Sequence, residues 1–314
     1  MKTLEINHDG NWVDRLLGPF LRAHLRSSWI YSHRVYTRYP FQANTHGLPR
    51  RVVRDCVRGF VEAALADTDS PPQSFADWCL RTFGRGISRE FMFPYNEKLW
   101  TVPLDQLTTD WMGRFVPRPK VSEVIAGGLL DQRTGFGYNA RFLYPRHGGI
   151  QALAASIAGQ VRSPHLGEEV VAVDLDRRRG ASASGGVYDF DWLVSTLPLP
   201  ALVRALNVRP PDIERAAAAL RWNTILNINF GVDRPGLASG RHWIYFPEKR
   251  YPFYRVGFPS AISPAMHPRG TSSLYVEVAF APGAPVDVAG SVRACRRGLE
   301  TAGLLRKSDR LLVT

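Results

Sequence analysis

A pair of glycines in front of an apolar run is the first feature of this sequence that could hold a ligand. Residues 144–153 read YPRHGGIQAL, so that Tyr144 and Arg146 lead into Gly148 and Gly149. Glycine allows the backbone to approach a ligand closely, and the free N–H groups at the start of a helix favour an anion. The pattern is equally typical of an ordinary helix entry, in which glycine satisfies an awkward backbone angle. The residues alone leave both interpretations open.

A second candidate is the aromatic segment FMFPYNEKLW at residues 91–100. Tyr95, Lys98 and Trp100 could face a planar or sugar-like ligand, because aromatic faces and a cation suit such a molecule. The alternative is a core segment with a turn at residues 94–96, and without further context the pattern favours this alternative.

A third candidate combines residues 243–247 (WIYFP) with residues 253–255 (FYR) on two expected strands. Alternation along a strand predicts that Trp243 shares a face with Tyr245, and Phe253 with Arg255. Plain cross-strand aromatic pairs would give the same pattern. Arg255 is the less ordinary residue, because the rest of its strand is apolar.

No complete dinucleotide-binding turn is found in the sequence. Residues 135–140 (GFGYNA) match G-x-G-x-x-A, but the motif requires a buried strand before it and a helix after it. Here LLDQRT precedes and RFLYP follows, and the Gly84-Arg-Gly86 stretch fails in the same way. The dispersed histidines and the missing G-x-S-x-G pattern also argue against a metal site or a hydrolase triad.

Composition narrows the class of protein. Hydrophobic residues are 45% and charged residues 22% of the 314, which is typical of a globular chain. The formal net charge is +12, but the basic residues are scattered and no nucleic-acid-reading motif accompanies them. No apolar run approaches the roughly 20 residues that span a bilayer. The three widely spaced cysteines indicate a reducing, cytoplasmic environment rather than a disulfide framework.

The elements that position these candidates are helical first and mixed later. Helical spacing is found at residues 11–25, 49–66, 74–80, 105–115, 121–130 and 149–161, and the last of these is expected to be buried. Residues 177–180 are expected to form a turn. Strand patterns follow at 169–176, 188–190, 192–196, 223–232, 241–246, 253–258, 273–280 and 309–314. Further helices are expected at 199–206, 211–221 and 286–303. The order predicts a mixed α/β protein without the regular βα alternation of a complete Rossmann sheet.

Several segments together resemble FAD-dependent proteins of the amine oxidase and protoporphyrinogen oxidase superfamily, in particular its UDP-galactopyranose mutase-like branch. The resemblance covers nearly the whole chain and rests on YPFQANTHGLP, FPYNEKLWTVPLDQLTTDW, GYNARFLYPRHGGIQALAASIA, EEVVAVDLD, DWLVSTLPLPAL, LNINFGV and HWIYFPEKRYPFYRVGFPSAISP.

The resemblance implies roles for individual residues. Arg146, Gly148 and Gly149 would lie beside the flavin, Val170 would contact the adenine side of FAD, and Thr196 would lie where the cofactor domain's sheet closes. The residues implied to line or approach the substrate pocket are Tyr95, Lys98, Trp100, Tyr144, Trp243 and Arg255.

Compared with the family pattern, the sequence lacks the G-x-G-x-x-G turn that holds pyrophosphate and the Gly-Asp segment near the C-terminus. We therefore expect a chain that corresponds to the middle of a family protein, truncated at both ends, with an incomplete Rossmann-type FAD domain and an interleaved substrate domain. The implied division is a mostly helical substrate region (1–140), part of the FAD-binding region (141–206), a substrate-domain sheet with helices (207–303) and the start of a C-terminal FAD-binding segment (304–314).

Three functions are compatible with the resemblance. The first is an FAD-dependent oxidoreductase, and the second is a flavin-dependent mutase of the UDP-galactopyranose mutase type. The third is a non-catalytic flavoprotein fragment. The expected partner in the first two is a small-molecule substrate, with a nucleotide sugar as the candidate for the mutase.

Overall fold

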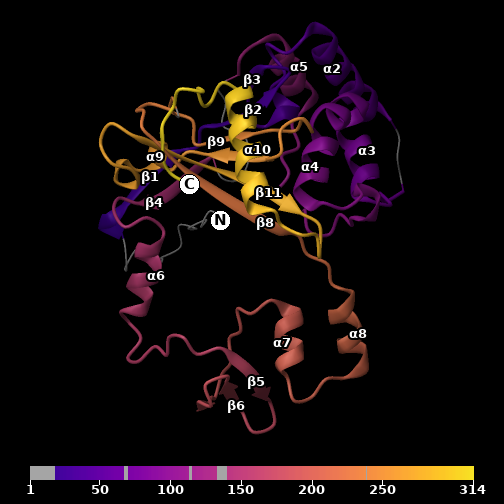
Figure 1. The fold of residues 1–314 in the computed structure, drawn as a ribbon. Helices are drawn as coiled ribbons and strands as arrows, with labels where there is room; N and C mark the ends of the chain where they lie inside the picture. The colour runs from indigo at the N-terminus through magenta and orange to yellow at the C-terminus, as the bar shows by residue number, and fades with distance from the viewer. Residues whose placement is uncertain (1–17, 67–69, 113–114, 133–139, 238) are drawn as a thin grey trace. The chain divides into compact units, whose positions relative to one another are not determined.

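The computed structural model describes residues 18–66, 70–112, 115–132, 140–237 and 239–314. By its internal contacts the chain divides into two compact units, which are described separately (Figure 1). Unit 1 contains the described residues up to Ser156 together with Asn223–Thr314, and unit 2 contains Ile157–Trp222. The division into two units does not test the four-part functional division expected from the sequence, which stays a prediction.

Unit 1 is built on a seven-stranded sheet with the strand order β12-β8-β11-β10-β9-β2-β3. Neighbouring strands are antiparallel, except that β2 runs parallel to β9. The bounds are β2 Ser28–Ser32, β3 Val35–Arg38, β8 Thr224–Val232, β9 Trp243–Tyr245, β10 Arg255–Gly257, β11 Ser272–Phe280 and β12 Leu311–Val313. The long strands β8 and β11 are rich in β-branched and aromatic residues, which suit a pleated and half-buried surface.

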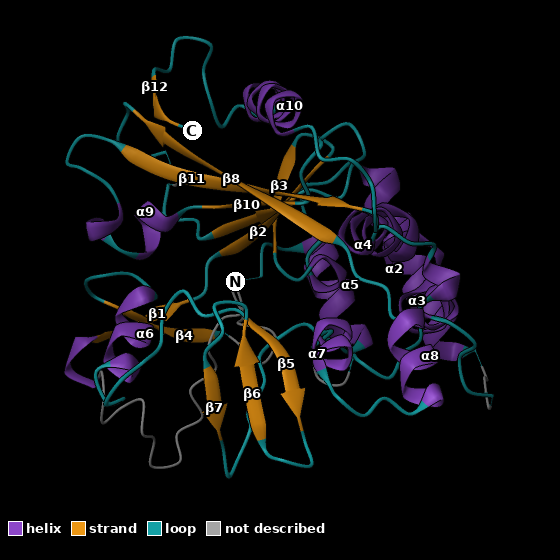
Figure 2. Cartoon of the chain, turned by 60° about the horizontal axis from the view of Figure 1, so that its bottom comes forward, coloured by secondary structure: helices purple, strands orange, loops and turns teal. Residues whose placement is uncertain are grey.

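One face of this sheet is covered by helix α10 (Val288–Thr301), which runs in front of the strands in Figure 1 and is seen nearly end-on beside them in Figure 2. The Asp287 side chain caps the helix by accepting a hydrogen bond from the Gly290 N–H at 2.8 Å. Cys295 and Leu299 of the helix are fully buried in one core cluster with Val256 and Val276 of the sheet. The residues of β10 and β11 that point to this side are therefore apolar.

A helical layer packs against the β2 and β9 part of the sheet. It consists of α2 (Arg50–Leu65), α3 (Phe75–Ile87), a π-helical turn (Ser88–Met92), α4 (Phe93–Trp100) and α5 (Val121–Leu129), with short 3-10 turns at Phe41–Ala43 and Leu104–Gln106. Ile30 and Tyr245 of the sheet share one core cluster with buried aromatic residues of these helices. The layer therefore places the end of α4 near strand β9.

Helices α2 and α3 cross closely because glycines remove side chains at the crossing. A Cβ atom on Gly84 would overlap the carbonyl group of Gly59, and a Cβ atom on Gly86 would overlap the carbonyl group of Asp55. Gly84 also has a positive φ of 72°, which favours glycine. Packing thus explains why the Gly84-Arg-Gly86 stretch is rich in glycine.

A two-stranded sheet of β1 (Leu21–Leu25) and β4 (Arg141–Pro145) lies at the start of unit 1 and follows a 3-10 turn at Gly18–Phe20. Strand β4 leads through the Gly148 and Gly149 turn into α6 (Gln151–Ala158). The short helix α9 (Pro259–Ile262) and a 3-10 turn (Pro264–Met266) connect β10 to β11.

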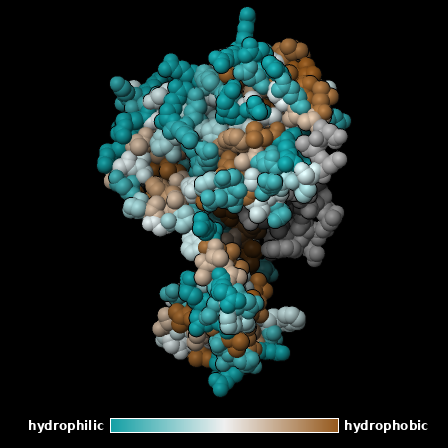
Figure 3. All heavy atoms as spheres, turned by 90° about the vertical axis from the view of Figure 1, so that its right-hand side faces the viewer, coloured by the Kyte–Doolittle hydropathy of each residue, from teal (hydrophilic) through white to brown (hydrophobic). Residues whose placement is uncertain are grey.

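Unit 2 holds a three-stranded antiparallel sheet with the order β5-β6-β7 and two helices. The bounds are β5 Val170–Asp174, β6 Arg179–Ser182, β7 Val187–Asp189, α7 Leu199–Ala205 and α8 Pro211–Ala219. Its buried apolar side chains of substantial size are Val173 and Val203 among the described residues, whereas Leu166, Trp192 and Val194 are 86, 91 and 89% exposed. Figure 3 shows such apolar side chains among polar ones at the molecular surface.

The mixed α/β class expected from the sequence is confirmed, and most expected elements exist. Helices expected at 49–66, 74–80, 121–130, 199–206, 211–221 and 286–303 correspond to α2, α3, α5, α7, α8 and α10. Ser74 caps helix α3, because its hydroxyl accepts a hydrogen bond from the Asp77 N–H at 3.2 Å. Strands expected at 169–176, 223–232, 241–246, 253–258, 273–280 and 309–314 correspond to β5, β8, β9, β10, β11 and β12.

Some expectations for the first half of the chain are wrong. The described part of the helix expected at 11–25 is the strand β1, because pairing with β4 outweighs a helical spacing of leucines. The helix expected at 105–115 is limited to the turn at Leu104–Gln106. The turn expected at residues 94–96 is the body of helix α4. Helix α6 exists, but it has no buried residue, so its apolar composition misled the burial prediction.

In unit 2 the strand positions are shifted from those expected. The expected turn at 177–180 runs into strand β6, and residues 192–196 form no strand. The third strand is β7 at Val187–Asp189. Of the G-x-G-x-x-A match at 135–140, all but the final alanine lies outside the described residues.

Candidate functional site

Three polar or aromatic side chains stand in one row across the middle of the large sheet. Arg255 of β10 is paired in register with Tyr245 of β9 on one side and with Glu277 of β11 on the other. Directly opposite residues of antiparallel strands share a face. Their neighbours Ile244 and Val256 lie in the core under α10, so the row occupies the other face of the sheet.

The row contains a buried ion pair. A terminal guanidinium nitrogen of Arg255 lies 2.6 Å from Oε1 of Glu277, and their side chains are only 22 and 4% exposed. Arg255 Nε and Glu277 Oε2 find no hydrogen-bond partner among the described residues. Buried polar atoms are normally satisfied by protein, water or ligand. The pair therefore has unused hydrogen-bonding capacity that is buried in this conformation.

A second row on the same face is aromatic. Trp243 and Tyr275 flank Gly257 in the register of β9, β10 and β11. The indole Nε1 of Trp243 donates a hydrogen bond to the hydroxyl of Tyr275 at 2.8 Å. The Tyr275 ring lies over Gly257, where a Cβ atom would overlap the ring. Glycine at this position thus lets the tyrosine lie flat along the sheet.

Helix α4 brings Tyr95 to the row. The Tyr95 ring centroid lies 5.6 Å from that of Tyr245 and 6.1 Å from that of Tyr254, in edge-on geometry, and the ring stacks on Phe91. Burial raises the pKa of the Tyr95 phenol well above its usual value. A neutral phenol is thus held against the face that carries Arg255.

Tyr144 connects the same face to the glycine turn. Tyr144, Trp243 and Tyr275 belong to one buried cluster. A Cβ atom built on Gly149 would lie 3.6 Å from the Tyr144 hydroxyl. Gly148 and Gly149 have φ values of 75° and 60°, so the left-handed turn itself requires glycine.

The glycine turn borders a basic cavity of about 210 Å³. Arg22, Arg146 and His147 line it together with His24 and Ser263, and its lining includes no carboxylate. Such a lining suits a phosphate or another electron-rich group. The volume accommodates one part of a large ligand, because pockets for whole drug-sized molecules measure roughly 300–1,000 Å³.

Lys98 forms hydrogen bonds to main-chain carbonyl groups, which its charge alone does not predict. Its ammonium donates to the carbonyl oxygens of Phe246 at 2.7 Å, Glu248 at 3.2 Å and Phe253 at 2.6 Å. An ammonium has three hydrogens, and three main-chain acceptors match them. Burial lowers the pKa of Lys98 to about 7. A substrate contact of Lys98 stays a prediction, and this conformation leaves it no spare hydrogen.

Trp100 packs against another aromatic residue, and the two remaining expected cofactor contacts belong to unit 2. The Trp100 ring centroid is 5.0 Å from that of Trp111, and its buried Nε1 finds no partner among the described residues. Val170 begins strand β5 and is 39% exposed, while Thr196 is exposed in a loop. Both belong to unit 2, so their proposed contacts with FAD stay predictions.

The structure therefore brings together Tyr95, Tyr144, Trp243 and Arg255 of the expected substrate residues, and it adds others. The added members are Tyr245, Tyr254, Tyr275 and Glu277, and also Arg26, which donates a hydrogen bond to the Tyr245 hydroxyl at 2.8 Å. A single carboxylate in the apolar stretch SLYVEVAF was the available signal for Glu277.

The sequence was then compared with known families. The family of flavin containing amine oxidoreductases matches residues 28–302. This chain belongs to the flavin containing amine oxidoreductase family. The superfamily inferred from the sequence motifs is thereby confirmed, and FAD is the cofactor that membership implies.

Solved structures place this chain near the mutase branch of the superfamily. Reduced UDP-galactopyranose mutase is 28% identical, with a TM-score of 0.87 over 95% of this chain and 67% of the other. A putative protoporphyrinogen oxidase from an Exiguobacterium species is 18% identical, with a TM-score of 0.64 over 96 and 70%. Putrescine oxidase with bound putrescine is 12% identical, with a TM-score of 0.59 over 96 and 69%. The last two share the fold.

The described residues of this chain fit part of a flavin cofactor. The positive charge of the cavity beside Gly148 suits a phosphate or the electron-rich edge of the flavin ring. The volume of the cavity holds one portion of the cofactor. Within the same residues, no helix is long and apolar enough to cross a membrane. No group of three or more histidine, cysteine or acidic side chains there could hold a metal ion.

Proposed function

We propose that this chain binds a nucleotide sugar on the sheet face that carries Arg255, and acts as a flavin-dependent mutase of the UDP-galactopyranose mutase type. The observation that supports it is a buried arginine set among aromatic rings. A guanidinium suits a phosphate, and the rings of Trp243, Tyr245 and Tyr275 suit a base or a sugar. The likeness to reduced UDP-galactopyranose mutase supports the same substrate class.

Each residue would contribute binding or orientation. Glu277 holds the guanidinium of Arg255 in place, and the bond from Trp243 fixes the Tyr275 hydroxyl. Tyr95 closes the face from the side of α4 and keeps water from the ion pair, which strengthens electrostatic contacts there.

Arg146, with the Gly148 and Gly149 turn, would hold the flavin. A reduced flavin, when bound, supplies the nucleophile that a sugar isomerisation without net oxidation requires. Arg22 and His147 add positive charge on the same side, so an anionic part of the cofactor would be held there.

The test begins with cofactor uptake. The chain is purified with FAD, freed of excess cofactor, reduced with dithionite and incubated with UDP-galactopyranose, and the products are separated by chromatography. A ring-contracted isomer supports the mutase. Arg255→Met should abolish the product, whereas Arg38→Lys, which alters an exposed pair with Asp131, should not.

Family membership supports a second candidate, an oxidoreductase that acts on another substrate. Flavin uptake with oxygen consumption on an amine, and without isomer formation, would favour it over the mutase. Failure to retain any flavin would contradict both enzymes for this chain and favour the non-catalytic alternative.

A further inference from the structure

The loop between β9 and β10, residues 246–254, separates Tyr245 from Arg255. We call it the β9–β10 loop. Its two ends meet through a hydrogen bond from the Phe246 N–H to the Tyr254 carbonyl at 2.9 Å. The conformation of this loop therefore decides how Tyr245, Tyr254 and Arg255 are presented to Tyr95.

One partly buried side chain from outside the sheet holds the inner side of this loop. The three carbonyl oxygens that accept hydrogen bonds from Lys98 belong to Phe246, Glu248 and Phe253, at the start and near the end of the loop. Below about pH 7, where Lys98 is protonated, hydrogen bonds from this ionised donor are roughly twice as strong as neutral ones. Lys98 lies almost one helical turn after Tyr95 on α4, so one helix carries both the ring and the group that holds the loop.

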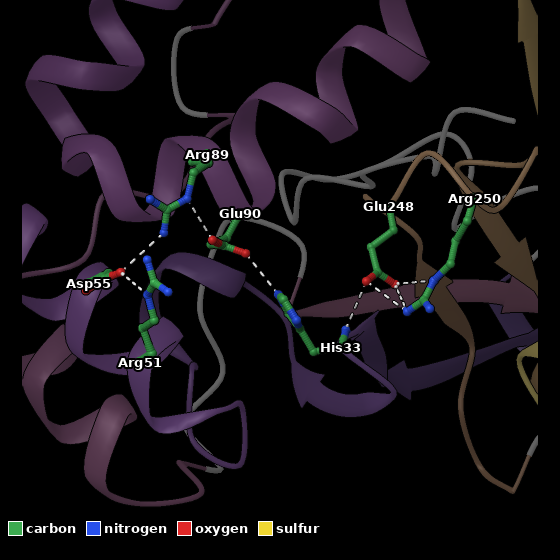
Figure 4. Close-up of polar contacts among 7 residues, drawn as sticks. All are labelled: His33, Arg51, Asp55, Arg89, Glu90, Glu248 and Arg250. Carbon is green, nitrogen blue, oxygen red and sulfur yellow. Dashed lines mark hydrogen bonds and ion pairs between the residues drawn. The ribbon is translucent and has the colours of Figure 1, made fainter.

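The outer side of the loop is tied to the turn between β2 and β3. The His33 N–H donates to Oε1 of Glu248 at 3.3 Å, and the His33 ring lies 2.9 Å from Oε2 of Glu90 (Figure 4). Arg250 pairs with the same Glu248 carboxylate. The Arg250 pair is partly exposed and therefore weak, whereas Lys98 alone makes three hydrogen bonds to the main chain of the loop.

We propose that Lys98 is a positioning residue, which fixes the β9–β10 loop so that Tyr245, Tyr254 and Arg255 face Tyr95. The statement that these residues meet a substrate rests on the proposed function. The restraint itself rests on three hydrogen bonds from one partly buried side chain, and it can be measured without any ligand.

The first test uses the unaltered chain. Reductive methylation of the folded protein followed by peptide mass spectrometry should modify Lys249, which is 77% exposed, and should spare Lys98. Methylation of Lys98 at the rate of Lys249 would overturn the proposal.

The second test follows the tyrosines. The full chain is labelled with 3-fluorotyrosine, and the ¹⁹F signals of Tyr95, Tyr245 and Tyr254 are assigned by single Tyr→Phe variants. Lys98→Met keeps the apolar stem and removes the donors, so it should shift these three signals and leave Tyr188 of unit 2 unchanged. Unchanged signals in Lys98→Met would contradict the proposal.

A matched control and a rescue separate positioning from general damage. Lys307→Met makes the same change at an exposed lysine outside the β9–β10 loop, and should leave all signals in place. Lys98→Arg retains donors and should restore the three signals at least in part. Loss of the signals in Lys98→Arg to the same extent as in Lys98→Met would show that the donors are not what matters.

Ligand binding then separates this inference from the proposed function. With UDP as the probe, tryptophan fluorescence titration should give about tenfold weaker binding for Lys98→Met, which corresponds to 1.4 kcal/mol. If the unaltered chain does not bind UDP, the nucleotide-sugar proposal fails, while the ¹⁹F result still decides the role of Lys98.

Discussion

Arg255 and Glu277 lie opposite one another on neighbouring strands, and each would be a costly buried charge without the other. The pair is neutral as a unit, so the sheet can keep a guanidinium on an aromatic face without an exposed counter-charge. For the same reason, removing one partner and removing both partners should have different effects.

We predict that Glu277→Leu lowers the free energy of unfolding by roughly 3–5 kcal/mol, because it leaves the Arg255 charge buried and unpaired. The double variant Arg255→Leu with Glu277→Leu should recover a large part of this loss. Urea unfolding followed by circular dichroism measures both. Equal loss in the single and the double variant would contradict the neutral-unit interpretation.

His242 should make the protein sensitive to acid. Burial, with smaller contributions from His24 and Arg26, lowers the pKa of His242 to about 4 from 6.5, and its Nδ1 accepts a hydrogen bond from the Ser27 N–H at 3.2 Å. Between these two pKa values the unfolded chain binds more protons than the folded one. The free energy of unfolding should therefore fall, by up to about 3 kcal/mol, as the pH decreases from 6.5 to 4.

The variant His242→Asn tests this directly. Asparagine offers an oxygen near the position of Nδ1 but takes up no proton, so the slope of stability against pH between 6.5 and 4 should flatten. His147→Asn, at an exposed position, is the control and should keep the slope. An unchanged slope in His242→Asn would remove this histidine as the cause.

At the scale of the elements, the crossing of α2 and α3 depends on the absence of a side chain at Gly84. Gly84→Ala combines a strained positive φ with overlap on the Gly59 carbonyl, and should lower the free energy of unfolding by about 2–4 kcal/mol. Gly270 has a similar φ of 81° with open space around it. Gly270→Ala should therefore show only the cost of the positive φ. The difference between the two variants in chemical unfolding then gives the cost of the overlap at the helix crossing. Equal losses would mean that packing at the crossing contributes nothing.

The elements that could be predicted from sequence are those with strong local signals. Helix α2 has a long apolar stripe, and α3 has a capping serine. Strand β1 could not be predicted, because its leucines continue a helical spacing and only its pairing with β4 makes it a strand. Helix α6 is apolar but exposed, and composition cannot say which surface covers a helix.

Candidate-site residues could be predicted from sequence where their residue type is unusual for the local sequence pattern. Arg255, Tyr95 and Trp243 combine charge or aromatic rings with a strand or turn pattern. Tyr275 and Glu277 join them only through the strand order β9-β10-β11, which sequence did not reveal. The main-chain carbonyl groups that accept hydrogen bonds from Lys98 are likewise distant in sequence. The sequence therefore could not show that these groups are partners of the lysine.

At the scale of the whole molecule, the two units differ in how much apolar surface they bury. Unit 2 buries Val173 and Val203 as its larger apolar side chains among the described residues, whereas the sheet of unit 1 has an extensive core under α10. We predict that amide hydrogens of β5 and β6 exchange much faster with deuterium than those of β8 and β11, because opening them exposes little buried surface. Exchange followed by mass spectrometry checks this.

Exchange rates of the four strands can be compared within one experiment, because each strand is hydrogen-bonded on at least one side. Fast exchange confined to chain ends and loops, with β5 as protected as β11, would contradict the prediction. It would mean that unit 2 gains stability from contacts other than its own core.

The parallel pairing of β2 with β9 has a consequence for the order of folding. Ser27 and His242, which meet where these strands begin, are 215 residues apart in sequence. During synthesis the edge of β2 that pairs with β9 therefore stays unpaired until all of unit 2 has left the ribosome. Loops of such length slow the closure of a sheet, and open edges invite aggregation. A chaperone that shields the nascent hairpin should therefore raise the yield of the folded chain more than it changes the stability of that chain.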